Sequence, residues 1–544
     1  MPRNVARILI FMRKLRRRTP DLGVYKVWLI AVIIGAAGAY GVIGFRYAID
    51  MVSVIAFGET EGGVVSGASS LHFLRAWAAP VIGGLAVSAL LYLADRFKWL
   101  EGGRGQGVPD VIEARAVSGG HVSLRSGIAS ATVSAVSLGA GASAGREGPA
   151  VHLGATIASV LHRYLGFSAK QRRALIGCGA AAAVSASFNA PIAGVLFALE
   201  VILGNYALSV FGPIAAASVS AAIVTRIHLG NYPAFSIPEY GASGTIDVPL
   251  AAILGLICGF IASGFLLTTQ RLTVGVREFA QRRNISYLLL PPIGGVVIGF
   301  IGAFYPEIFG VGYEAVTKAL RGEYAIPLLM ILVLMKCAAT AVTLSCRFGG
   351  GVFSPGLVIG AFAGAAFGAI LGVAFPGLTA SPVYYAMIGM GAAAGAILGA
   401  PISTTLIVFE MTGDYSITIA LMVAVAIATL VTQWLCGQSF FHWQLSRRGY
   451  DLSEGPQGII LKTMRVREVM EKMPPGAPLP EEADRLDTRD SLGEALAKLN
   501  EAEEHGLPVV ETDAPEKVVG YLSRVKALAA YNKALIEENI EHHT

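Results

Sequence analysis

Charged residues are scarce in this chain of 544 residues. They make up 15% of it, whereas hydrophobic residues make up 54%. Soluble globular proteins carry about 25% charged and about 45–50% apolar residues. The mean hydropathy of +0.61 is also outside the range of such proteins. The shortage of charge excludes a soluble enzyme and a disordered protein, and it indicates an all-α polytopic membrane protein.

Cysteine is rare as well. The five cysteines, Cys178, Cys258, Cys337, Cys346 and Cys436, lie far apart and form neither a CxxC pair nor a metal-ligand spacing. This excludes a disulfide scaffold, and we predict no metal and no cofactor. The chain also lacks a basic stripe interleaved with aromatic residues, so we exclude nucleic acid as a partner.

Long apolar runs are what the chain has instead, and many are about 17–25 residues long, the length that crosses a bilayer. The runs fall at roughly 24–57, 76–95, 127–142, 174–203, 207–226, 248–270, 287–304, 326–345, 355–375, 383–410 and 415–437. Several are rich in Gly, Ala and Ser or are interrupted by proline. Small residues let helices approach closely in lipid, and broken helices are tolerated only beside protein or a wet cavity. These interruptions therefore point to a transport pathway.

Charge is unevenly distributed along the chain. Residues 461–544 carry 11 basic and 17 acidic side chains, a net charge of −6, so the other 460 residues, with 31 and 20, carry +11. We therefore divide the chain into a basic N-terminal segment (1–23), a membrane domain (24–455) and a small α/β tail (456–544). The basic residues before the first apolar run predict a cytoplasmic N-terminus by the positive-inside rule. We also expect a cytoplasmic C-terminus, and the short loops and compact tail indicate the plasma (inner) membrane of a bacterium.

The membrane domain contains an internal repeat. Residues 176–182 read IGCGAAA and residues 388–394 read IGMGAAA, and in each copy an Ala-Pro-Ile follows, with a glutamate nine residues after its proline, at Glu200 and Glu410. Two equivalent halves, about 76–226 and 287–437, each with an interrupted element, are typical of transporter folds built from inverted repeats.

Three glycine-rich junctions precede apolar helices. They are Gly105-Gln106-Gly107-Val108-Pro109, Gly145-Arg146-Glu147-Gly148-Pro149, and Gly349-Gly350-Gly351-Val352-Phe353-Ser354-Pro355. Proline is favoured in the first turn of a helix, and helix N-termini carry unpaired N–H groups that attract anions. If the three junctions converge within the membrane, they form a site for a small anion.

These junctions resemble the motifs G-S-G-I-P, G-R-E-G-P and G-G-x-F-x-P of the CLC family of chloride channels and proton-coupled chloride exchangers. The second and third are intact, and the resemblance spans residues 25–450. It implies tilted and broken helices in two inverted repeats, a homodimer with one pore per subunit, and chloride or another monovalent anion as the transported ligand.

The resemblance also implies roles for individual residues. Glu147 corresponds to the gating glutamate, and the backbone amides of Val352 and Phe353 correspond to ligands of the central anion. The family's serine and tyrosine ligands are replaced here by Gln106 and Phe441. A phenylalanine cannot donate a hydrogen bond, so chloride binding should depend more on backbone amides. The remaining predicted anion-site residues come from the junctions: Gly105, Gly107, Val108, Pro109, Gly145, Arg146, Gly148, Pro149 and Gly351.

The coupling to protons is the open question. Family exchangers usually carry a second glutamate directly after the one that matches Glu200, and this chain has Val201 there, so the proton-relay position is lost. Val201 and Phe441 favour channel-like or weakly proton-coupled anion transport. A proton-coupled exchanger is the alternative, and fluoride export is a less favoured third, because that branch departs from G-R-E-G-P.

Glu147 also has a simpler interpretation, in which it forms a salt bridge with a neighbouring arginine. A separate alternative comes from Gly141-Ala142-Ser143-Ala144-Gly145, which satisfies the nucleophile-elbow pattern G-x-S-x-G of serine hydrolases. The context of strand, turn and helix that this pattern needs is not evident. We therefore predict that the chain is not an enzyme.

The tail resembles a CBS (cystathionine-β-synthase type) domain. Its sequence predicts a helix at Ser491–Glu501, strands at Gly506–Val510 and Val518–Ser523, and a helix from Val525. A single copy fits, whereas the family usually has two, and we hypothesise that it pairs across a homodimer. Adenine nucleotide is a possible ligand of this domain type, without residues specific enough to name.

Overall fold

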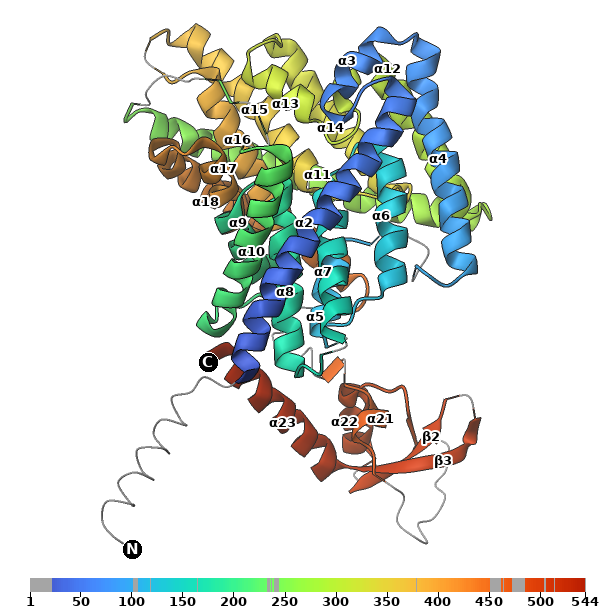
Figure 1. Cartoon of the computed structure of the whole chain (residues 1–544). Coiled ribbons are helices and arrows are strands. Elements are labelled where there is room, and N and C mark those ends of the chain that lie inside the picture. The colour runs from blue at the N-terminus through green and yellow to red at the C-terminus, as the bar shows by residue number, and fades with distance from the viewer. Residues whose placement is uncertain are drawn as a thin grey trace, which may run out of the picture.

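A computed structural model describes residues 22–100, 106–117, 119–163, 165–231, 235, 237–238, 244–377, 379–450, 461–462, 464–471, 485–502, 505–512 and 514–543. They form a large helical body and a small α/β tail at one end of it (Figure 1). In the described part, eight helices are long and apolar enough to cross a membrane. The predicted N-terminal segment lies almost entirely outside the described residues.

The first half of the body contains the helices up to residue 229. They are α2 (Leu22–Phe57), α3 (Val64–Ser70), α4 (Phe73–Arg96), α5 (Val108–Ala116), α6 (Leu124–Gly139), α7 (Glu147–Arg163), α8 (Ala169–Phe188), α9 (Pro191–Phe197) and α10 (Leu208–Leu229). A short 3-10 turn, η1 (Glu61–Gly63), precedes α3, and a π-helical turn, η3 (Ala198–Leu203), continues α9.

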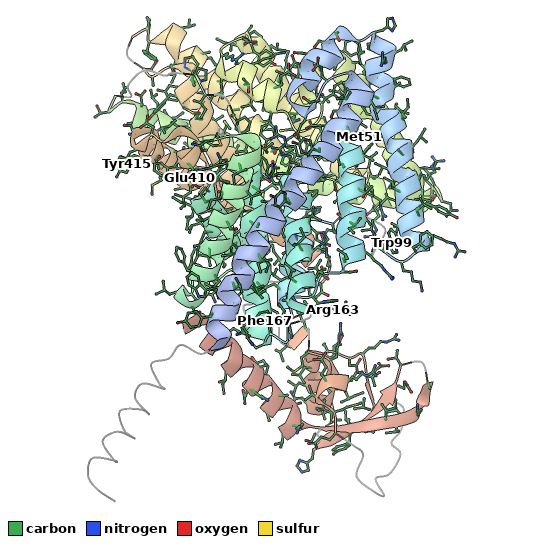
Figure 2. The ribbon with its side chains drawn as sticks, in the orientation of Figure 1. Met51, Trp99, Arg163, Phe167, Glu410 and Tyr415 are labelled. Carbon is green, nitrogen blue, oxygen red and sulfur yellow. The ribbon has the colours of Figure 1, made fainter. Side chains whose placement is uncertain are left out.

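The second half repeats this arrangement from α11 onward. Its helices are α11 (Asp247–Arg282), α12 (Leu290–Phe304), α13 (Tyr313–Leu320), α14 (Ile326–Ser345), α15 (Phe353–Ala374), α16 (Pro382–Leu398), α17 (Pro401–Thr412), α18 (Tyr415–Cys436) and α19 (Phe440–Ser446). The 3-10 turns η4 (Tyr287–Leu289) and η5 (Pro306–Ile308) lie before α12 and α13. Large apolar side chains cover the outer faces of the helices, including Met51 and Tyr415 (Figure 2).

Two of the apolar runs that contain a proline are broken in the structure, as the prolines predicted. The run 174–203 divides after α8, where Asn189 adopts left-handed backbone angles, and the run 383–410 divides after α16, where Gly399 does the same. Pro191 and Pro401 then begin the next helices. A proline without an N–H fits a first turn but not a helix interior, so the break occurs at the same place in both halves.

The two halves hold each other's broken helices. Glu200 accepts hydrogen bonds from the N–H groups of Ile402 and Ser403 at the start of α17 (3.0 and 2.8 Å). Glu410 accepts them from Ile192 and Ala193 at the start of α9 (2.9 and 2.7 Å). Each carboxylate thus satisfies unpaired N–H groups of the other half, which gives these glutamates a structural role.

Glycine also allows close helix packing within each half. A Cβ on Gly154 of α7 would lie 2.3 Å from the carbonyl oxygen of Gly179 of α8. A Cβ on Gly360 of α15 would lie 2.0 Å from the carbonyl oxygen of Gly389 of α16. Neither position can accept a side chain, which explains the small residues that the sequence concentrates there.

The tail consists of α21 (Val466–Val469), β1 (Leu486–Asp487), α22 (Leu492–Glu501), β2 (Gly506–Glu511), β3 (Ala514–Ser523) and α23 (Arg524–His543). The sheet order is β1-β2-β3, with β1 parallel and β3 antiparallel to β2. The sequence predicted the last four elements and missed the two-residue β1. At the start of α22, the backbone N–H and the hydroxyl of Ser491 donate to Glu494 and hold the pKa of that carboxyl below its usual range.

Candidate functional site

The three glycine junctions converge at the centre of the body. Gly145 and Gly351 exchange two backbone hydrogen bonds, with N···O distances of 2.7 and 2.8 Å, so the second and third junctions are directly paired. A Cβ on Gly148 would lie 3.4 Å from Cα of Gly351, and a Cβ on Gly107 would lie 3.8 Å from the carbonyl carbon of Gly148. The predicted convergence is therefore present. Gly105 lies outside the described residues.

Each junction ends at the first turn of a helix. Val108, Glu147 and Phe353 are the first residues of α5, α7 and α15, and the prolines follow within the first three positions. The N-terminal N–H groups of a helix carry about half a positive charge. Three such ends around one point make an environment that favours a small anion and disfavours a bare cation.

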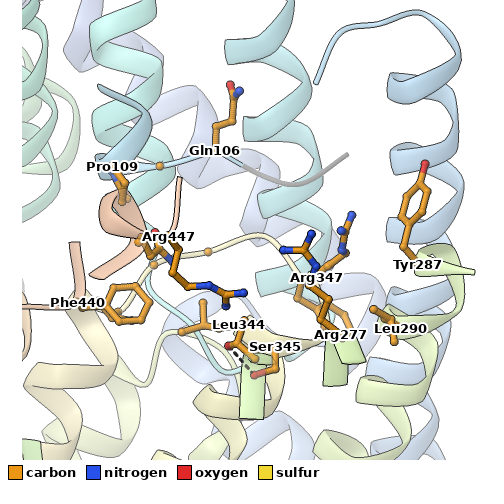
Figure 3. Close-up of a pocket in the computed structure, with 18 of the residues that line it drawn as sticks. Gln106, Pro109, Arg277, Tyr287, Leu290, Leu344, Ser345, Arg347, Phe440 and Arg447 are labelled. Carbon is orange, nitrogen blue, oxygen red and sulfur yellow. Dashed lines mark hydrogen bonds between the residues drawn. The ribbon is translucent and has the colours of Figure 1, made fainter. Parts of the chain in front are cut away.

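A cavity of about 770 Å³ reaches the junctions. Val352, Phe353 and Phe441 line it at the junctions, together with Gly107, Val108, Pro109, Gly148 and Gly351. Arg277, Arg347 and Arg447 line its wider part, and Figure 3 shows their side chains gathered around the same space. Among the described lining residues, the acidic one is Asp110, which forms an ion pair with Arg448 at 3.0 Å.

Aromatic rings enclose the cavity beside the third junction. The ring of Phe353 packs against those of Phe188 and Phe197, with centroids 5.1 and 5.9 Å away. Phe441, at the start of α19, is 5% exposed. Its ring faces the cavity without a polar atom, as the sequence predicted.

Gln106 is tied to α6. Its backbone N–H donates to the Ser130 hydroxyl (2.7 Å), which donates to the Gln106 carbonyl oxygen (2.8 Å). The carboxamide oxygen accepts a hydrogen bond from the Ser126 hydroxyl. The side chain of Gln106 points away from the gathered arginines in Figure 3. Gln106 thus lines the cavity while its carboxamide oxygen is engaged by α6.

Glu147 is 1% exposed and is held by two hydroxyl groups. The Tyr313 hydroxyl donates to Oε1 of Glu147 at 3.0 Å, and the Ser354 hydroxyl donates to the same oxygen at 2.6 Å. Oε2 is buried and has no hydrogen-bond partner among the described residues. The carboxylate therefore sits between the start of α7, α13 and the start of α15.

Arg146 does not pair with Glu147. Its guanidinium forms a buried ion pair with Glu61 of η1, and it lies 4.6 Å from the centroid of the Tyr313 ring. The simpler interpretation of Glu147, a salt bridge with the arginine beside it, is therefore wrong. Arg146 is paired with Glu61 instead, and the hydrogen-bond donors to the Glu147 carboxylate are neutral hydroxyl groups.

Two further residues from the sequence analysis have defined surroundings. Val201 lies in the π-helical turn η3, directly after the capping residue Glu200. The hydroxyl group of Ser143, in the hydrolase-like pattern, lies 3.2 Å from the hydroxyl group of Thr340. Among the contacts of the described residues, none joins Ser143 to a histidine. Its surroundings are two hydroxyl groups of α14.

Sequence reasoning missed three residues around Glu147. Ser354 belongs to the third junction. Because the second and third junctions were predicted to converge, a contact between Ser354 and Glu147 could have been predicted. Tyr313 follows Gly312, whose φ of +95° determines how the chain enters α13. Tyr313 and Glu147 are 166 positions apart in the sequence, and only the fold brings them together. Glu61 is one acid in a short loop, with no local pattern to mark it.

The fold and the site together define a membrane transport protein with broken helices whose N-termini meet at a central site. The family model described as "Voltage gated chloride channel" matches residues 83–433. A ClcB-like chloride channel protein of Ralstonia nicotianae is 33% identical over 399 residues, covering 73% of this chain and 91% of that protein. ClcB of Escherichia coli O17:K52:H18, a voltage-gated ClC-type chloride channel, is 32% identical over 422 residues, covering 76% and 97%. The chain belongs to the voltage-gated chloride channel (CLC) family.

Solved structures agree with this fold. A slow cyanobacterial Cl⁻/H⁺ antiporter superposes with a TM-score of 0.68 at 22% identity, covering 78% of this chain and 97% of the other. A CLC-type fluoride/proton antiporter gives a TM-score of 0.63 at 22% identity, covering 77% and 98%. The predicted fold of inverted repeats with a small α/β tail is confirmed.

Proposed function

We propose that the protein carries chloride or a similar monovalent anion across the membrane, past the three glycine junctions, with Glu147 as the gate. The observation that carries this proposal is the convergence of three helix N-termini beside one buried carboxylate. The relatives that cover most of the chain are named as chloride channels, which supports the choice of anion.

The gate works by competition for one place. An ionised Glu147 carboxylate lies at the positive end of α7 and accepts hydrogen bonds from the hydroxyl groups of Tyr313 and Ser354. Protonation removes its charge, so an anion can take the place that the carboxylate held. The anion itself is held by the backbone amides around Val352 and Phe353, because Phe441 offers no donor.

We favour channel-like or weakly proton-coupled transport. A proton must reach Glu147 from the far side for stoichiometric exchange, and Val201 cannot relay one. Glu200, its neighbour, is engaged as a cap of α17. The second candidate is a proton-coupled exchanger, supported by the antiporters among the structures of the same fold.

One experiment tests both the gate and the coupling. The purified protein is reconstituted in liposomes, and chloride efflux and proton movement are recorded together between pH 4.5 and 7.5. We expect chloride flux that rises as the pH falls, with little uphill proton movement. The Glu147→Gln variant should conduct at all pH values without this dependence. Wild-type pH dependence in that variant would refute the gate, and proton pumping at a fixed ratio would establish the exchanger.

The assembly and its surroundings follow the family. We propose a homodimer in the bacterial plasma membrane, with both termini in the cytoplasm and a membrane domain over residues 24–455. Exposed apolar residues on α10 and α18, such as Phe211 and Ile419, supply an apolar face for a second copy or for lipid.

We also propose that the tail is a single CBS-like unit that pairs across the dimer. Adenine nucleotide is its candidate ligand.

A further inference from the structure

We propose that Tyr313 is a positioning residue of the gate: its hydroxyl holds the carboxylate of Glu147 in the closed place, and the buried Glu61–Arg146 pair holds the Tyr313 ring. This inference rests on the proposed role of Glu147 as the gate. The first half of the body supplies Glu61, Arg146 and Glu147, and the second half supplies Tyr313 and Ser354. The gate is thus built from both halves.

The Tyr313 ring is fixed on two sides. The guanidinium of Arg146 lies 4.6 Å from its centroid, and the ring of Phe235 lies 4.7 Å away. Arg146 is in turn held by Glu61, and both side chains of this pair are less than 10% exposed. A cation over an aromatic face is attracted by the ring, the more so when water is excluded. The ion pair therefore fixes the tyrosine ring whose hydroxyl group holds Glu147, in addition to its electrostatic interaction with that carboxylate.

The backbone before Tyr313 is anchored by a buried lysine. Lys336 of α14 is fully buried, and its Nζ donates to the carbonyl oxygens of Ile308 and Gly310 at 2.9 and 3.0 Å. Gly312 then turns the chain into α13 with a φ of +95°. These contacts determine where the first residue of α13 places its side chain, so the hydroxyl of Tyr313 is directed to Glu147.

The charged groups around the gate can be named. Glu147 faces the Tyr313 hydroxyl from α13 and the Ser354 hydroxyl from α15. The Arg146–Glu61 pair lies behind Tyr313, and Asp50 of α2 accepts from the backbone N–H of Glu61 at 2.9 Å. On α14, the amino group of Lys336 donates to the carbonyl oxygens of Ile308 and Gly310. In the described structure, the direct contacts of the carboxylate are thus two neutral hydroxyl donors.

Two hydroxyl donors favour the ionised carboxylate. A hydrogen bond to the charged form of an acid stabilises that form against protonation. Removal of one donor therefore weakens the hold on the carboxylate in the closed position, so the carboxylate is displaced more easily. The hydroxyl groups of Tyr313 and Ser354 donate to the same oxygen of Glu147. The loss of either hydroxyl group therefore weakens the binding of the carboxylate in its closed position but does not remove the gate.

The test is Tyr313→Phe, which keeps the ring against Arg146 and Phe235 and removes only the hydroxyl. In liposomes, the pH of half-maximal chloride efflux should rise by about one unit relative to wild type. Ser354→Ala should shift it in the same direction. Tyr324→Phe is the matched control, because the buried Tyr324 hydroxyl has no hydrogen-bond partner within the part of the chain that the structure describes. This control should leave the midpoint unchanged.

A double variant separates gate positioning from a general structural effect. In the Glu147→Gln background, Tyr313→Phe should add no pH dependence and should leave the flux within about twofold, since the charged partner is gone. An unchanged midpoint in Tyr313→Phe would overturn the inference, as would the same shift in Tyr324→Phe or a full effect in the Glu147→Gln background. If Glu147→Gln itself kept wild-type pH dependence, the proposed gate would fail instead.

Discussion

Phe441 shows how one missing oxygen atom changes what the cavity offers to an anion. The side chain is buried at the start of α19 and lines the cavity beside Val352 and Phe353. A tyrosine in the same rotamer would direct a hydroxyl group into this space. In the proposed anion site, backbone N–H groups are therefore the donors beside Phe441, which itself offers none.

We therefore predict that Phe441→Tyr strengthens chloride binding. A hydrogen bond to a charged group contributes about 1.5–3 kcal/mol, and 1.4 kcal/mol is tenfold in affinity, so we expect about tenfold tighter binding. Isothermal titration of the purified protein with chloride measures this. Phe211→Tyr, at an exposed ring of α10 that does not line this cavity, is the control and should change the affinity by less than about twofold. Equal affinities in wild type and Phe441→Tyr would place the anion away from this ring.

At the scale of elements, the reciprocal caps of Glu200 and Glu410 join the two halves. Each carboxylate lies at the N-terminus of a broken helix that belongs to the other half. Short helices such as α9 depend on such partners, because their first N–H groups have none within the helix. Figure 2 labels Glu410 within the helical body, where α17 and α9 are neighbours.

We predict that Glu410→Gln lowers the stability of the membrane domain by about 1 kcal/mol, since it removes the charge from the cap and keeps one acceptor oxygen. Thermal unfolding in detergent measures the loss. Glu278→Gln, at an exposed residue that pairs with Arg282 on the same helix, is the control and should change stability by less than 0.5 kcal/mol. A loss in the control equal to that of Glu410→Gln would contradict the capping role.

The elements were largely predictable from periodic and repeated sequence. Apolar length gave the long helices, and the repeated Ala-Pro-Ile gave the equivalent halves. The breaks at Pro191 and Pro401 were predicted from the prolines, whereas the left-handed residues Asn189 and Gly399 that precede them leave no mark in composition. The strand Leu486–Asp487 was missed since two residues carry no alternation.

At the scale of the whole molecule, positive charge is concentrated on one side of the junctions. The arginines at 277, 347 and 447 come from α11 and from the segments after α14 and α19, and they line one cavity (Figure 3). Helix α13 lies toward the end of the body that is opposite to the tail (Figure 1). A cavity lined by charges of one sign raises the local concentration of counter-ions.

We predict that the double variant Arg277→Gln, Arg447→Gln reduces chloride flux about threefold at 20 mM salt and much less at 300 mM, because salt screens charges at this range. Liposome efflux at the two salt concentrations measures it. Lys517→Gln, in the tail and exposed, is the control. A reduction that is the same at both concentrations would indicate a structural defect rather than the loss of an electrostatic effect.

The site was only partly predictable. The glycine junctions and Glu147 follow from local motifs, because helix starts and buried acids leave marks in the sequence, whereas Phe441 was assigned only through the family resemblance. Tyr313, Glu61 and Lys336 do not, since their positions depend on how the two halves pack together. Long-range contacts of single residues have no periodic signature in the sequence.

The central claim is that backbone amides at the three junctions hold the transported anion. Bromide-soaked crystals, measured at the bromine absorption edge, test it most directly. We predict an anomalous peak within hydrogen-bond distance of the amides of Val352 or Phe353, and in Glu147→Gln a second peak at the place of the carboxylate. Bromide bound only at the arginines or on the surface of both proteins, with nothing between the junctions, would contradict the account.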